Sequence, residues 1–89
     1  DEGSVYRMRF VCLLEALDGK TKEFACRLSG IASKHKEKQF LGLFGKPDAV
    51  IIFEAESEEK ATEFVLEFSG VARSETLLAV DPRKLKHRT

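Results

Sequence analysis

One short stretch of the sequence and one residue further along could together form a ligand site. Gly45, Lys46 and Asp48 belong to the stretch Gly45-Lys46-Pro47-Asp48, whose turn residues could present backbone amides and a carboxylate to a small ligand. Arg73 lies near the start of the last predicted strand and would supply a counter-charge. The simpler interpretation is a hairpin turn in which Asp48 bonds the backbone.

The candidate catalytic residues occupy unfavourable positions. Covalent catalysis requires a nucleophile beside a base that is held by a third group. Cys12 and Cys26 both fall on predicted core-facing stripes, and His35 is placed to end a helix as a capping cation. We therefore predict no catalytic residues, although an enzyme using Tyr6, His35 or Asp48 in a pocket under the sheet stays an open alternative.

Cysteine and histidine spacing also argues against metal chemistry. None of Cys12, Cys26, His35 and His87 lies within metal-ligand spacing of another, and no phosphate-binding loop is present. We predict no metal and no cofactor. Without a C-x-x-C motif, the two cysteines are expected to be reduced, mostly buried thiols of a cytoplasmic protein, with a disulfide or a reactive thiol as alternatives.

Length and composition indicate one small folded domain. The chain has 89 residues, 43% of them apolar and 34% charged, and its fifteen Lys and Arg balance fifteen Asp and Glu. Such a chain has one core but is too small for a deep enclosed chamber. No apolar run is longer than that of residues 49–53, which is far shorter than the roughly 20 residues that cross a bilayer, and the acidic N-terminus does not resemble a signal peptide.

The first half of the chain predicts a strand and then a helix. Residues 5–17 alternate, with an apolar set at the even positions that should face the core: Tyr6, Met8, Phe10, Cys12, Leu14 and Ala16. Residues 21–35 carry an amphipathic stripe that should also be buried: Phe24, Ala25, Leu28, Ile31 and Ala32. The segment 20–38 is basic, with six Lys and Arg against two Glu.

The second half predicts two strands, a helix and a last strand. Residues 38–44 and 49–55 should form an antiparallel hairpin through the turn 45–48. Ser57 is a suitable N-cap for an acidic helix that ends near Gly70 and buries Ala61, Phe64, Val65 and Phe68. Residues 71–80 predict a fourth strand, stopped by Asp81-Pro82.

The order β-α-β-β-α-β predicts an α+β, ferredoxin-like fold. Right-handed crossovers would give an antiparallel sheet in which the first and third predicted strands are central and both helices cover one face. Residues 1–82 should form this single domain, and residues 83–89 should be a basic C-terminal tail without periodicity. The opposite charges of the two helices should screen each other on that face, or else meet between subunits.

The second face of the predicted sheet is too apolar for a monomer. Odd-numbered and even-numbered positions are both apolar in residues 40–44, 50–53 and 77–80. An uncovered face would therefore expose a larger apolar patch than soluble monomers usually do. We predict a homodimer, or a higher homo-oligomer, packed through this open sheet face. The alternative cover is a missing part of the same polypeptide.

The stretch of residues 43–80 resembles the GYD domain family. The shared features are a turn ending in Asp48, a strand ending in Glu54-Ala55, an acidic-capped helix at Ser57-Glu58-Glu59, and a strand containing Val71-Ala72-Arg73-Ser74-Glu75-Thr76. Pro47 replaces the usual aromatic residue, and Ala72 is inserted between the Val and the Arg. The resemblance implies a dimeric α+β barrel assembly of ferredoxin-like modules, with no generally assigned activity.

A weaker likeness extends to the ligand-sensing domain of the leucine-responsive transcription regulators. It is carried by the G-x-x-D turn, Gly45 to Asp48, and by the overall topology. This resemblance implies binding of a small molecule at a subunit interface.

RNA-recognition domains share the predicted topology. Their third strand carries aromatic residues that stack on bases. Here Asp48 and Val50 occupy the two stacking positions, and the balanced charge removes a general attraction to phosphate. We therefore expect no nucleic-acid partner.

The sequence thus predicts a homo-oligomeric module that binds a small ligand or a partner protein without catalysis. The alternatives are a small dimeric α+β-barrel enzyme, of monooxygenase or isomerase type, and an RNA-binding domain.

Overall fold

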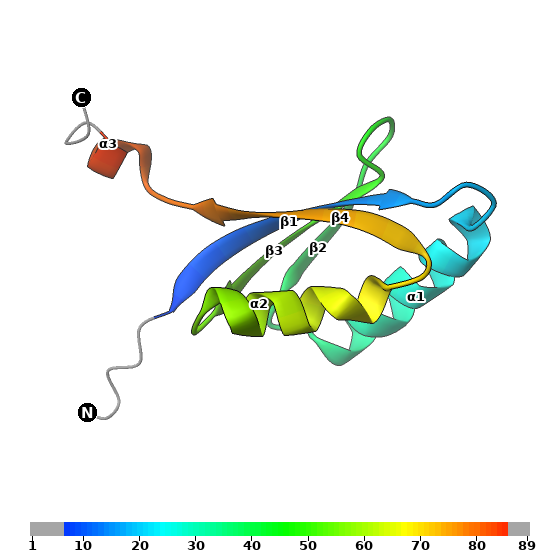
Figure 1. Ribbon diagram of the computed structural model, residues 1–89, viewed down its shortest axis with the longest axis horizontal. Coiled ribbons are helices and arrows are strands. Elements are labelled where there is room, and N and C mark those ends of the chain that lie inside the picture. Colours follow the sequence, from blue (N-terminus) through cyan, green and yellow to red (C-terminus); the bar gives the residue numbers. More distant parts are fainter. Residues whose placement is uncertain (1–6, 86–89) are drawn as a thin grey trace.

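A sheet with both long helices on one of its faces makes up the body of the protein (Figure 1). A computed structural model describes residues 7–85. The elements in chain order are β1 (Met8–Ala16), α1 (Thr21–Lys34), β2 (Gln39–Gly42), β3 (Ala49–Ala55), α2 (Glu58–Val65), the 3₁₀ turn η1 (Leu66–Phe68), β4 (Ala72–Ala79) and α3 (Pro82–Leu85). The four strands are antiparallel in the order β2-β3-β1-β4, so the predicted ferredoxin-like fold and strand order are confirmed.

Strand β1 contributes side chains to both faces of the sheet. It pairs with β3 on one side and with β4 on the other, and its side chains alternate between the faces. Phe10, Cys12 and Leu14 are buried beneath the helices, as the even-numbered pattern predicted, whereas Val11 and Leu13 are half-buried on the opposite face.

Phe64 of α2 is the centre of an aromatic cluster between the helices and the sheet. Its ring centroid lies 5.0 Å from that of Phe53 and 6.4 Å from those of Phe40 and Phe68. The predicted N-cap is confirmed, because the Ser57 hydroxyl accepts a hydrogen bond from the Lys60 amide at 3.2 Å. The cap and the aromatic contacts together fix where α2 begins and how it lies on the sheet.

Helix α1 is buried on a narrower stripe than predicted. Phe24 and Ile31 are buried, but Ala25 is exposed. Cys26, predicted to face the core, is also exposed. At about 100° per residue, Cys26 is two steps from Phe24 and lies on the opposite side of the helix. Only Cys12 has the expected buried setting.

Strand β2 is shorter than predicted. Pairing with β3 ends at Gly42, opposite Ala49, and the residues before Ala49 form a loop that also contains Phe44. The Phe44 side chain is fully exposed instead of belonging to a strand. Gly45 has a φ of 117°, a conformation that favours glycine and turns the chain within this loop.

The region after β4 begins with a short helix instead of an irregular tail. Asp81 accepts hydrogen bonds from the Arg83 amide at 2.9 Å and from Arg83 Nη2 at 2.6 Å, which starts the turn Pro82–Leu85. The Arg83 side chain lowers the pKa of the Asp81 carboxyl. The predictions for Tyr6 and for His87 lie outside the described residues.

The face of the sheet opposite the helices carries an aliphatic band. Strand pairing places Ile52, Val11 and Leu77 in one row and Leu41, Val50 and Leu13 in the next. Leu41 and Leu77 are 41% and 44% exposed, and the other four members are half-buried. We call this surface the open face, and the six residues the aliphatic band.

Candidate functional site

Asp48 fixes the loop between β2 and β3 against the end of β1. Its amide donates to the Leu14 carbonyl at 2.9 Å, and its Oδ2 accepts from the Ala16 amide at 2.8 Å. Its carbonyl accepts from the Leu43 amide at 2.8 Å, which closes the loop on itself. The predicted backbone-bonding role of Asp48 is therefore confirmed, and one of its carboxylate oxygens is already engaged.

Two of the predicted ligand residues converge on a carboxylate that sequence analysis had not selected. Lys46 Nζ lies 2.7 Å from Glu15 Oε2, and Arg73 Nη2 lies 3.1 Å from Glu15 Oε1. Glu15 is on the open face, directly opposite Arg73 across the β1–β4 pairing. We call these three residues the Glu15 cluster.

Electrostatics within the Glu15 cluster keep the carboxylate charged. The hydrogen bond from Lys46 is the main cause that lowers the pKa of Glu15, and the hydrogen bond from Arg73 adds to it. In return, Glu15 raises the pKa of Lys46. A carboxylate held in its charged form by two cations is a weak proton acceptor, so this cluster suits binding better than general-base catalysis.

A hollow of about 480 Å³ adjoins the Glu15 cluster. Its lining combines two cations, two carboxylates and apolar surface: Leu13, Leu14, Glu15, Lys46, Pro47, Arg73, Ser74 and Glu75. Lys46 and Arg73 of the predicted set line the hollow, whereas Gly45 and Asp48 shape the loop beside it. Glu15, Ser74 and Glu75 were missed, because their contribution depends on strand pairing between distant parts of the chain.

The candidate nucleophiles and bases lie apart from this hollow. Burial raises the pKa of the Cys12 thiol, which disfavours the reactive thiolate. Cys26 is exposed on α1, and His35 caps the C-terminus of that helix through its backbone amide. None of these three residues is among those that line the hollow.

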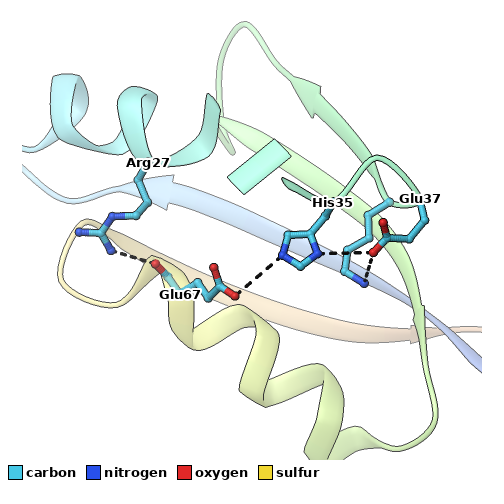
Figure 2. A network of polar contacts seen from close by, with 5 residues as sticks. Arg27, His35, Glu37 and Glu67 are labelled. Carbon is cyan, nitrogen blue, oxygen red and sulfur yellow. Dashed lines mark hydrogen bonds and ion pairs between the residues drawn. The ribbon is translucent and has the colours of Figure 1, made fainter. Parts of the chain in front are cut away.

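A second polar cluster ties the end of α1 to η1 and to the start of β2 (Figure 2). His35 Nδ1 lies 3.4 Å from Glu37 Oε2, and His35 Nε2 lies 4.0 Å from Glu67 Oε2. Arg27 Nη1 donates to the Glu67 carbonyl at 2.8 Å. These contacts between the basic and the acidic helix lie within one subunit and hold the helical layer together.

Lys38 extends this second cluster into the core. Its Nζ lies 4.9 Å from the Phe64 ring centroid and 5.4 Å from that of Phe53, and its side chain is only 14% exposed. Glu37 pairs with the same ammonium at 3.4 Å. The cation-π contacts and the ion pair make Lys38 a structural residue between β2 and α2.

The described residues contain neither a metal-ligand cluster nor a membrane-spanning helix. Among residues 7–85, no group of three His, Cys, Asp or Glu side chains is arranged to hold a metal ion. In the same part of the chain, no helix combines the length and apolarity needed to span a bilayer.

Comparison with known proteins supports the fold alone. No protein-family model matches the chain, and no curated protein matches it. The crystal structure of PH0061 is similar, with a TM-score of 0.69 and 14% sequence identity over 91% of this chain and 57% of that chain. The chain thus spans little more than half of PH0061. These findings define an α+β protein of ferredoxin-like fold, and the GYD resemblance stays a prediction.

The acceptor role of Asp48 can be tested by two substitutions. Asp48→Ala leaves the part-buried Ala16 amide without its acceptor and should lower the free energy of unfolding by about 1–3 kcal/mol. Asp48→Asn keeps a side-chain oxygen and should cost clearly less. Urea unfolding of both variants measures the difference, and equal losses would contradict the acceptor role.

Glu15 should make stability depend on pH in the acid range. Because its pKa is lowered on folding, its contribution is fully present above the ordinary glutamate value of about 4.5 and is lost as the pH falls through the lower folded value. Glu15→Gln should therefore be less stable than wild type at about pH 7, and this difference should shrink below about pH 4.5. Thermal unfolding across this range measures it, and a gap independent of pH would contradict the assignment.

Proposed function

We propose that the protein is a homo-oligomeric binding module whose subunits associate through the open face and hold a small ligand beside the Glu15 cluster. The observation that carries the proposal is the aliphatic band, a continuous apolar surface in the middle of a sheet face that residues 7–85 leave uncovered. Its side chains are aliphatic and offer no rings on which bases could stack, which favours a protein surface as the cover.

The charges at the two ends of the aliphatic band favour a second copy of the chain as that cover. At one end, Arg9 Nη2 lies 3.7 Å from Glu54 Oε2. At the other end, Glu15 meets Lys46 and Arg73. Each end holds both signs of charge, so a two-fold arrangement can set positive against negative groups around an apolar centre.

Association would also enclose the hollow at the Glu15 cluster. In a single subunit this hollow opens at one end of the open face and is lined partly by Leu13 of the aliphatic band. A partner sheet packed on that face would cover it and exclude water. The lining then suits a small polar ligand that carries both an anionic and a cationic group.

Binding is favoured over catalysis by the state of the polar groups. Glu15 is held charged by two cations, and one carboxylate oxygen of Asp48 is engaged by a backbone amide. Neither group is poised to accept a proton from a substrate. A small dimeric α+β-barrel enzyme is the less favoured assignment for this reason.

Association through the open face is tested by a charge placed in the aliphatic band. Leu13→Asp should halve the mass of the assembly, because it buries a carboxylate in the proposed interface. Leu66→Asp is the matched control, since Leu66 follows α2 in the helical layer and is already 62% exposed. Size exclusion with light scattering measures both masses. A monomeric wild type, or a Leu13→Asp variant of unchanged mass, would contradict the proposal.

Ligand binding is tested by thermal shift with amino acids as the first probes, followed by flavins and haem. A compound at about ten times its Kd would stabilise the fold by roughly 1.4 kcal/mol, which raises Tm by on the order of 5–10 °C in a domain of this size. Lys46→Ala should reduce the shift, whereas Lys60→Ala, on the exposed side of α2, should leave it unchanged. The absence of a shift with every probe would contradict the ligand role while leaving the assembly result intact.

A further inference from the structure

Strand β4 is an exposed edge of the sheet along almost its whole length. It forms one end of the strand order, and residues 73–78 are exposed on both faces of the sheet. It has eight residues, whereas β2 at the opposite edge has four. A long exposed edge presents unpaired backbone groups to another strand.

Backbone geometry identifies which groups of β4 point outward. The Leu17 amide donates to the Val71 carbonyl at 2.9 Å, so this carbonyl points toward the chain that continues from β1, whereas the Val71 amide donates to the Phe68 carbonyl at 3.2 Å. In an antiparallel pair, the direction alternates from one residue to the next. The amides and carbonyls of Ala72, Ser74, Thr76 and Leu78 therefore point away from the sheet.

We propose that β4 pairs antiparallel with β4 of a second copy about a two-fold axis at Ser74, which joins two sheets edge to edge. This register places Ser74 opposite Ser74 of the partner subunit, with two backbone hydrogen bonds between them. It also places Arg73 opposite the partner subunit's Glu75, and Glu75 opposite the partner subunit's Arg73. Two oppositely charged cross-strand pairs then flank the axis on the same face of the joined sheet.

Charge complementarity distinguishes this register from its neighbours. An axis at Glu75 would set the two Glu75 carboxylates against each other, which is unfavourable. An axis at Thr76 would set Glu75 against Leu77 of the partner subunit, and neither Arg73 nor Glu75 would then face an opposite charge across the axis. Arg73 is bound to Glu15 of its own subunit, whereas Glu75 belongs to no ion pair among the described residues, so the Glu75 carboxylate is available to approach Arg73 of the partner subunit in the pairing at Ser74.

The surroundings of β4 leave room for a second strand. On the helix side, a shallow groove of about 260 Å³ runs between α2, η1 and β4. Its β4 wall consists of the small side chains of Ala72, Ser74 and Thr76. Edge pairing uses the outward backbone groups of β4, whereas face packing uses the open-face side chains, to which β4 contributes Leu77, so the two contacts can coexist in one assembly.

Cysteine cross-linking tests the edge and its register. In a Cys26→Ser background, which removes the exposed native thiol, Ser74→Cys places two thiols on the axis with Cα atoms about 5.5 Å apart. Thr76→Cys is the matched control, because the same register separates its two Cα atoms by about 14 Å. Mild oxidation, or a thiol cross-linker too short for that longer distance, should yield a covalent dimer from Ser74→Cys alone. Cross-linking of both variants, of Thr76→Cys alone, or of neither would overturn the proposal.

Two further variants in the Ser74→Cys background distinguish pairing at the β4 edge from packing through the open face. Glu75→Lys sets like charges against each other across the axis and should reduce the yield of cross-linked dimer several-fold. Leu13→Asp, which disrupts the open face, should leave the yield unchanged. Edge pairing would be overturned if Glu75→Lys left the yield of cross-linked dimer undiminished, or if Leu13→Asp abolished that yield. If only face packing fails, the cross-linking yields stay as expected and the failure is seen only in the mass measured by light scattering.

Discussion

The two-residue alternation of β1 is the constraint on which the rest of the structure depends. β1 is bonded on both sides, so its register sets that of β3 and β4, and its side chains divide the sheet into two unlike faces. Cys12 and Leu14 complete the core with the helices, while Val11 and Leu13 form the centre of the aliphatic band. A shift of one residue would exchange these sets and place Glu15 under the helices, away from Lys46 and Arg73.

The end of β1 also links the fold to the candidate site. The Ala16 amide is bonded by Asp48, and the neighbouring Glu15 carboxylate binds Lys46 from the same loop. Arg73 reaches Glu15 from β4, so three segments far apart in the chain meet at two adjacent residues of one strand. The loop is positioned by the bond between Asp48 and the Ala16 amide and by the ion pair between Lys46 and Glu15 on the open face. These two contacts explain how a loop of this length can line a defined hollow.

Local patterns were sufficient for the fold but not for the site. The alternation of β1, the Ser57 cap and the stripe of α2 are short-range features, and the structure has all of them. Glu15 was not predicted as a site residue because it becomes one only through pairing with partners 31 and 58 positions away. Lengths and exposures that depend on tertiary packing were also mispredicted: Phe44 leaves β2, and Cys26 lies outside the buried stripe of α1. Asp81 starts a helical turn where the sequence predicted a tail without periodicity, because the residues that follow it are mostly basic and show no helical pattern.

The small size of the chain makes its uncovered surfaces informative. With 89 residues and two long helices, only one face of the sheet can be covered from within the described part of the chain, and the helical layer leaves the outer strand β4 exposed on both sides. The open face and the β4 edge differ in chemistry: the first is aliphatic and non-directional, whereas the second offers backbone hydrogen bonds at a fixed spacing. An apolar face favours association over a range of orientations, whereas a strand edge favours one register. In the proposed assembly, the open face would therefore supply most of the free energy of association, and the β4 edge would set the relative orientation of the subunits.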